Sequence, residues 1–214
     1  MSAAANFCSH RMPFAPELKS LQAVRLGTLS LIAPLDQKQL DYAPAQGKWS
    51  IGEIVDHLLL AQQFERGIIE ELILLSRSGK KPFVNRTFLE FELRPAFVPR
   101  RVILPLDPLL SFFSAQVPQS IRKWVMTRGP VPFRGPAQAA PRHGLPGDDL
   151  RKRLLTSHES IASLYETNAD LDFHTLVAHH SMLGSMDMIE MLRIMAYHET
   201  RHQKQISRII RRLS

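Results

Sequence analysis

The residues with the clearest chemistry lie near the C-terminus, where the chain reads His198-Glu199-Thr200-Arg201-His202. This is the H-E-x-x-H spacing, in which two histidines bind zinc and the glutamate acts as the base of a metalloprotease. Residues four apart on a helix lie on the same face, so the two imidazoles would be neighbours. The pentapeptide therefore predicts a metal site, either of a protease or of another kind of protein.

Both histidines belong to an apolar stripe at helical spacing. The stripe consists of Met191, Ile194, Met195, His198, His202, Ile206 and Ile209. Its pattern predicts that both rings face the interior, where an imidazole needs a hydrogen-bond partner or a metal. A divalent cation would satisfy two adjacent rings at once, and a hydrogen-bonded histidine cluster without metal is the alternative.

The third ligand of an H-E-x-x-H protease usually follows the motif. Here only twelve residues follow His202, and they contain no His, Glu or Asp. An upstream ligand is therefore required, and the best candidate is His57, on the apolar side of another predicted helix. We interpret His57, His198 and His202 as one metal site, with the protease as the less favoured alternative.

Three neutral imidazoles that leave at least one open position are typical of catalytic metal sites. Nitrogen ligands suit zinc and nickel best here, with iron, copper and manganese as alternatives. Glu199 is a candidate base or hydrogen-bond partner in such a site, unless it is a solvated helix residue. Arg201 is a candidate for binding an anionic cofactor or substrate. His180 is a candidate for a pocket mouth, although a loop role is favoured.

Composition predicts one globular domain over residues 1–214. Apolar residues make up 44% of the chain and charged residues 22%, which is ordinary for a soluble protein. The single cysteine, Cys8, excludes a disulfide framework and a cysteine metal site, and it fits a reducing cytoplasm. No apolar stretch of about 20 residues predicts a membrane span, and the N-terminus lacks the apolar core of a signal peptide.

The net charge of +7 raises the possibility of an anionic partner such as nucleic acid. Basic residues are spread along the chain, and the densest run comprises Arg201, Lys204, Arg208, Arg211 and Arg212. We interpret this run as the solvated face of a helix, with nucleic-acid binding as the less favoured alternative. The expected partner is a small-molecule substrate.

Four amphipathic helices are predicted, over residues 16–33, 50–77, 148–167 and 186–213. The second has the clearest start, because Ser50 and Glu53 have the spacing of a capping box. The first is less regular, because Arg25 interrupts its apolar stripe and Gly27 is a poor helix former.

Residues 79–147 differ from the helical segments because they are rich in proline, arginine and phenylalanine. The stretch is too long for a simple connection, and its apolar clusters favour a crossover that packs on the core over a second domain. Short helices are predicted near 107–115 and 118–126. Outside the crossover the sequence shows almost no strand pattern. Four helices with a long crossover between the second and third predict an all-α four-helix bundle.

Two motifs resemble those of the DinB-like superfamily, also called DinB/YfiT-like, whose members are described as metalloenzymes. The motifs are WSIGEIVDHLLLAQ and HSMLGSMDMIEMLRIMAYHETRHQKQI. The first has the Trp-Ser start followed by Glu and His, and the second has the Gly turn, two His four apart, and a Gln before an Ile. The resemblance covers most of residues 16–77 and 148–213, and no motif of the crossover.

The resemblance implies an up-down-down-up bundle, a metal held by His57, His198 and His202, and frequent homodimers. Relatives include S-transferases that use low-molecular-weight thiols, a thiol-dependent isomerase and hydrolases, so the reaction does not transfer by analogy. We expect a thiol-dependent S-transferase or a hydrolase, with a non-catalytic metal-binding or stress-response protein as the alternative. His180-Ser181 departs from the His-Pro that relatives often carry.

Overall fold

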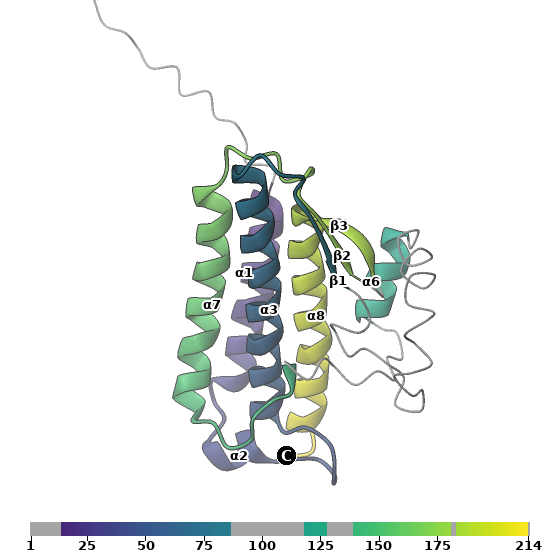
Figure 1. Ribbon diagram of the computed structural model, residues 1–214. Coiled ribbons are helices and arrows are strands. Elements are labelled where there is room, and N and C mark those ends of the chain that lie inside the picture. Colours follow the sequence, from purple (N-terminus) through teal and green to yellow (C-terminus); the bar gives the residue numbers. More distant parts are fainter. Residues whose placement is uncertain (1–13, 87–117, 128–138, 181–182, 214) are drawn as a thin grey trace, which may run out of the picture.

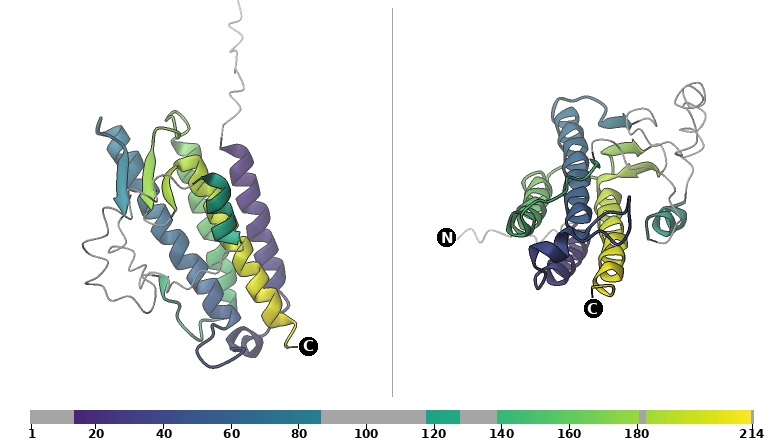
Figure 2. Two further views of the ribbon diagram at one scale, coloured as in Figure 1. Left: turned by 90° about the vertical axis from the view of Figure 1, so that its right-hand side faces the viewer. Right: turned by 90° about the horizontal axis from the view of Figure 1, so that it is seen from below.

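The computed structural model describes residues 14–86, 118–127, 139–180 and 183–213. Its four long helices are α1 (Ala15–Ile32), α3 (Ile51–Arg77), α7 (Gly147–Thr167) and α8 (Met188–Ile210). They lie side by side as a bundle, in which α1 and α8 run in one direction and α3 and α7 in the other (Figure 1). Helices α7 and α8 occupy opposite corners, and α1 and α3 lie between them (Figure 2).

Side-chain caps define where α3 and α8 begin. At the start of α3, the Glu53 N–H donates to the Ser50 hydroxyl at 3.2 Å, and the Ser50 N–H donates to the Glu53 carboxylate at 2.8 Å, so the predicted capping box is present. The start of α8 is capped by Asp187, which accepts from the Glu190 N–H at 2.7 Å. A short helix, α2 (Gln37–Asp41), was not expected from the sequence.

A small sheet is the main departure from the all-helical prediction. Its strands are β1 (Phe83–Arg86), β2 (Val177–His180) and β3 (Gly184–Asp187), in the order β1-β2-β3. Strand β1 is parallel to β2, and β2 is antiparallel to β3. The expectation of almost no strand outside the crossover was therefore wrong, because four-residue strands are too short to show an alternating pattern.

The sheet also corrects the predicted start of the last helix. Residues 184–187 form β3, so α8 begins at Met188 and not at residue 186. Strand β3 leads directly into α8, and the sheet lies on the side of the bundle opposite α7 (Figures 1 and 2).

Two described parts of the crossover pack on the bundle. Helix α6 (Gln119–Thr127) agrees with the helix expected near 118–126, and it contacts α8 through an Arg122–Glu190 ion pair of 2.8 Å. The segment 139–146 leads back to α7 and contacts α3 through Ala139 and Arg142. The helix expected near 107–115 lies outside the described residues.

The core consists of two apolar clusters, one at each end of the bundle. The cluster at the end where α8 begins includes Phe14, Leu21, Ile69, Tyr165 and Leu192. The cluster at the other end includes Ile32, Ile54, Leu150, Leu154 and Ile206. Between them lies a layer in which polar side chains are buried, including Arg25, Thr28, Gln62, Glu199 and His202. Desolvated polar groups of this kind need matched partners, so this layer is where chemistry is expected.

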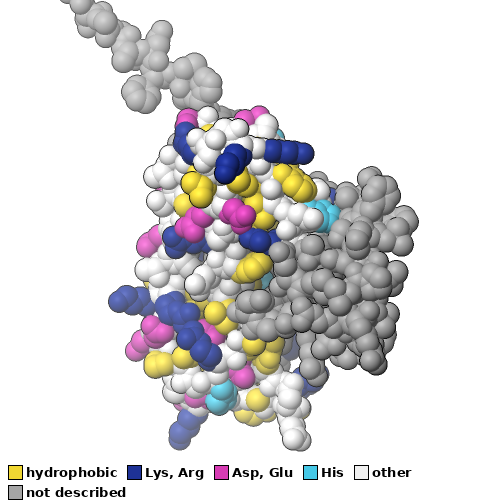
Figure 3. All heavy atoms as spheres, viewed as in Figure 1, with side chains coloured by type: hydrophobic (Ala, Val, Ile, Leu, Met, Phe, Trp, Pro, Cys, Tyr) yellow, Lys and Arg dark blue, Asp and Glu magenta, His cyan; other side chains and the backbone are white. Residues whose placement is uncertain are grey.

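The described helices and the face formed by α3 and α7 indicate neither a membrane span nor a continuous basic surface (Figure 3). On the face formed by α3 and α7, basic and acidic side chains are interspersed and no continuous basic field is visible (Figure 3). None of the described helices combines the length and the apolar character needed to cross a membrane.

Candidate metal centre

The structure brings the three predicted ligands together at the interface of α3 and α8. The His198 Nε2 atom lies 3.0 Å from the Nε2 atom of His202 and 3.4 Å from that of His57. One ring nitrogen from each residue falls within 4.8 Å of the other two. Of the described His, Cys, Asp and Glu residues, these three form the group with metal-ligand spacing.

The distances between the ring nitrogens fit a small divalent cation. Three nitrogens bound to zinc at about 2.0–2.1 Å in a tetrahedral arrangement lie about 3.3 Å from one another. The two measured separations, 3.0 and 3.4 Å, bracket that value. The ligand atoms of the remaining pair, His57 and His202, lie within 4.8 Å of each other, so a small adjustment of the side chains would place all three nitrogens around one cation.

Hydrogen bonds at the far side of two rings define which nitrogens face inward. The His57 Nδ1–H donates to the Ala139 carbonyl oxygen at 2.8 Å, and the His202 Nδ1–H donates to the Gln205 amide oxygen at 3.0 Å. Both Nε2 atoms consequently present a lone pair to the centre, an arrangement common for metal-bound histidine. A proton on His198 Nε2 could satisfy one of these lone pairs but not both. A shared cation would satisfy all three rings.

The environment keeps these imidazoles neutral, as ligands must be. Burial lowers the pKa of His202 to about 3, with the neighbouring His57 adding to the effect. Burial also lowers the pKa of His57. For His198 the pKa falls well below its usual value, because of desolvation and then the charges of His202, His57 and Arg201. His57 and His202 are buried, and His198 is half-buried.

Asp56, the residue before His57, binds the segment whose Ala139 carbonyl accepts a hydrogen bond from the His57 ring. Its fully buried carboxylate accepts from the Arg142 N–H at 2.9 Å and from the Arg142 guanidinium at 2.8 and 3.1 Å. Arg153 donates a further bond of 3.3 Å. These contacts hold the segment that contains Ala139 against α3, so that its carbonyl stays on His57.

Trp49 forms an apolar wall beside the centre. Its ring centroid lies 4.8 Å from that of His57 and 6.4 Å from that of His202. This contact was not predicted from the sequence, and neither were the roles of Asp56, Ala139 and Gln205. The available signal was local: Trp49 and Asp56 both lie in the same motif as His57.

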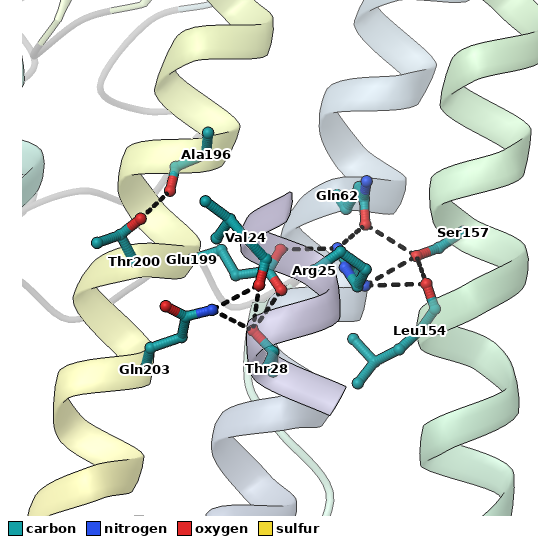
Figure 4. Close-up of polar contacts among 10 residues, drawn as sticks. All are labelled: Val24, Arg25, Thr28, Gln62, Leu154, Ser157, Ala196, Glu199, Thr200 and Gln203. Atoms are coloured by element: carbon teal, nitrogen blue, oxygen red, sulfur yellow. Dashed lines mark hydrogen bonds and ion pairs between the residues drawn. The ribbon is translucent and has the colours of Figure 1, made fainter. Parts of the chain in front are cut away.

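Glu199 lies one residue after His198 but faces another helix. It is 2% exposed, so the alternative of a solvated glutamate was wrong. One carboxylate oxygen lies 3.0 Å from Arg25 Nη2, and the other accepts from the Thr28 hydroxyl at 2.6 Å (Figure 4). Both oxygens are therefore engaged by α1, and this geometry does not support a catalytic base directed at the histidines.

Arg201 and His180 occupy different surroundings. Arg201 is half-buried, and its positive charge contributes to lowering the pKa of both His198 and His202, so its charge lies near the centre. His180 ends strand β2, outside the three-histidine group, where burial and then the charge of His179 lower its pKa to about 4.

Comparison with known families shows which superfamily the chain belongs to. No curated protein and no solved structure matches the chain. The model of the DinB superfamily matches residues 20–206, which include all three histidines and every long helix for most of its length. The chain therefore belongs to the DinB superfamily.

Proposed function

We propose that this protein is a metal-dependent enzyme that uses His57, His198 and His202 as ligands and transfers a thiol sulfur to an electrophilic small molecule. The observation that carries the proposal is the convergence of three imidazoles whose Nε2 lone pairs outnumber the protons available to them. A divalent cation bound there, zinc or nickel in the first instance, would act as a Lewis acid that lowers the pKa of a thiol or water at the open position.

The residues of this chain would do the remaining work. The half-buried Arg201, whose charge lies near the centre, would attract the carboxylate or other anionic group of a low-molecular-weight thiol. The wall formed by Trp49 covers one side of two of the three rings. In the transfer itself, a sulfur–carbon bond forms while the bond from carbon to its leaving group breaks, and the thiol proton passes to solvent.

Two alternatives remain within the same family. A hydrolase would use water in place of the thiol at the same centre. A non-catalytic metal-binding or stress-response protein would hold the metal without turnover. Family resemblance also leads us to propose a homodimer, which size-exclusion chromatography with light scattering would test. The single cysteine leads us to propose a cytoplasmic location, which fractionation of cells would test.

The ligand assignment is tested by elemental analysis of protein purified without a nickel column. We expect wild type to retain about one metal ion per chain. His57→Ala should retain much less, because loss of one ligand should lower the metal affinity more than about 100-fold. His174→Ala is the matched control, because His174 is an exposed histidine paired with Asp187 outside the centre. Equal metal content in wild type and His57→Ala would reject the assignment.

The reaction is tested by supplying the metal-loaded protein with a low-molecular-weight thiol and an activated aryl halide. Thiol-dependent turnover that disappears with chelator and returns with one metal supports the transferase. Turnover of an activated ester without thiol supports the hydrolase, and neither activity supports the binding protein.

A further inference from the structure

The glutamate of H-E-x-x-H has a role in the structure that differs from its role in proteases. It belongs to a group of buried polar side chains, here called the arginine cluster: Arg25, Thr28, Gln62, Ser157, Glu199 and Gln203 (Figure 4). The cluster draws on all four long helices of the bundle. Two of its members, Glu199 and Gln203, immediately follow the ligands His198 and His202.

Arg25 is the centre of the cluster. Its guanidinium pairs with Glu199 of α8 at 3.0 Å and donates to Gln62 of α3 at 2.6 Å. It also donates to the Leu154 carbonyl and the Ser157 hydroxyl of α7, each at 3.2 Å. A single side chain of α1 thus connects the two helices that carry the histidines, and Gln62 lies five residues after His57 on α3.

Gln203 adds a second contact one turn further along α8. Its side-chain amide donates to the Thr28 hydroxyl at 3.0 Å and to the Val24 carbonyl. Gly27 permits this approach, because a Cβ atom at that position would lie 2.9 Å from Gln203 Nε2. Two contacts four residues apart fix both the rotation of α8 about its axis and its height against α1.

The precision of a metal site makes such fixing necessary. A rotation of α8 by about 20° would move a side-chain tip at the helix surface by on the order of 2 Å. Metal–ligand distances hold within about 0.2 Å, so the same rotation would take His198 and His202 out of reach of His57. The stripe of Glu199 and Gln203 lies about 100° around α8 from the stripe of the histidines. Contacts that fix the first stripe against α1 therefore also fix the direction in which the histidines point.

We propose that Glu199, held by Arg25 and Thr28, is a positioning residue that aims His198 and His202 at His57. The inference rests on the proposed metal centre. It places Glu199 behind the ligands, where it sets their orientation without contacting the metal or the substrate. Loss of the anchor should therefore change how the site binds metal even in protein that remains folded.

The test uses cobalt(II), whose visible spectrum reports the geometry of its ligands, bound to the full-length protein. Arg25→Met/Glu199→Met removes both charges with similar side-chain volume, and such replacements of buried ion pairs are often neutral for folding. We expect this double variant to bind cobalt at least about tenfold more weakly than wild type, with an altered visible spectrum. Glu199→Gln, which retains an acceptor for Thr28, should keep more of the wild-type spectrum.

A matched control comes from a second ion pair between the same helices. Arg193 of α8 donates to Glu17 of α1 at 2.7 and 3.0 Å, five residues before His198. Glu17→Met/Arg193→Met should leave cobalt affinity and spectrum unchanged. Thr28→Val, which removes one hydrogen bond to Glu199 and keeps the ion pair, provides a milder variant should the double variant fail to fold. It should weaken cobalt binding by about threefold.

The outcomes separate this inference from the proposed function. Wild-type affinity and spectrum in Arg25→Met/Glu199→Met, or in Thr28→Val where that variant replaces it, would overturn the positioning role and leave the metal centre intact. An equal loss in the Glu17→Met/Arg193→Met control would also overturn it. Failure of wild type to bind cobalt would overturn the proposed function and the inference together.

Discussion

Two polar clusters lie side by side in the middle of this bundle, and they are completed in different ways. In the arginine cluster, positive and negative groups are matched within the protein, and both oxygens of Glu199 have donors. In the histidine cluster, formed by His57, His198 and His202, lone pairs converge and the protein supplies too few donors. The charges of the first cluster are paired within the protein, although Arg25 Nε and Gln62 Nε2 are buried without a hydrogen-bond partner among the described residues, whereas the second cluster would be completed by a cation.

The difference shows how α8 serves two purposes at once. Consecutive residues on a helix point about 100° apart, so H-E-x-x-H directs its histidines to α3 and its glutamate to α1. The comparison predicts that the arginine cluster contributes stability that does not depend on metal, and that the histidine cluster contributes stability that does.

The largest expected effect comes from removing one charge of the arginine cluster. Arg25→Met leaves the buried carboxylate of Glu199 without its counterion, and breaking a buried pair in this way costs about 3–5 kcal/mol. Urea unfolding at neutral pH should show this loss in the metal-free protein. In the presence of metal the loss should be larger by about 1.4 kcal/mol for each tenfold weakening of metal binding. Recovery of most of the stability in Arg25→Met/Glu199→Met would confirm that the unpaired Glu199 carboxylate causes the loss. A loss present only in the metal-free protein would contradict the prediction that the arginine cluster stabilises the fold independently of metal.

Metal binding should have the next largest effect, and only through the histidine cluster. A ligand at 1,000 times its Kd stabilises the folded state by about 4 kcal/mol, so zinc at that excess should raise the unfolding midpoint of wild type and chelator should reverse the change. His202→Asn should show no zinc-dependent increase. An equal increase in this variant would show that zinc acts elsewhere on the protein.

The long helices and the convergence of the three histidines could be predicted from the sequence because both are encoded by local spacing. Ser50 and Glu53 specify the start of α3, and the four-residue spacing of His198 and His202 specifies a shared face. The inward direction of His57 followed from its apolar neighbours on the same helix. Periodicity and capping act within one helix, so they can be recognised without knowledge of the partner.

Features that depend on distant segments were not predictable in the same way. Arg25 and Gly27 looked like defects of the first helix, but each is explained by a contact with α8: Arg25 with Glu199, and Gly27 with Gln203. Similarly, β1 and β2 are separated by about ninety residues of sequence, and neither is long enough to show its own pattern. Residues that break a local pattern were therefore the best guide to the buried polar layer.

Acid should lower the stability of the metal-free protein through the histidine cluster, by a smaller amount. Burial lowers the pKa of His202 to about 3, while an unfolded histidine titrates near 6.5. Between these values the unfolded chain binds the proton more readily, so the metal-free protein loses stability as pH falls from about 6.5 towards 3. At pH 5 this one group should account for about 2 kcal/mol relative to pH 7.

Chemical unfolding of metal-free protein at pH 7, 6 and 5 would measure this slope, and His202→Asn should flatten it. His174 supplies a contrast of opposite sign, because Asp187 raises its pKa. The stability contributed by that pair is present at acidic pH and is lost as pH rises through the folded pKa, so His174→Asn should lower stability at pH 5 more than at pH 8. A His202→Asn variant as acid-sensitive as wild type would show that another group controls the acid response.

The smallest expected effects distinguish the two kinds of bond that Asp56 makes to Arg142. The Arg142 side chain is 55% exposed, so Arg142→Ala should cost less than about 1 kcal/mol, because the backbone N–H of residue 142 and the Arg153 guanidinium still bind Asp56. Asp56→Asn weakens all of these contacts and should reduce metal affinity by about tenfold through the Ala139 carbonyl that orients His57. Equal metal affinities in the two variants would mean that the Ala139 carbonyl keeps its place without the Asp56 carboxylate. The orientation of the His57 ring would then depend on its packing against Trp49.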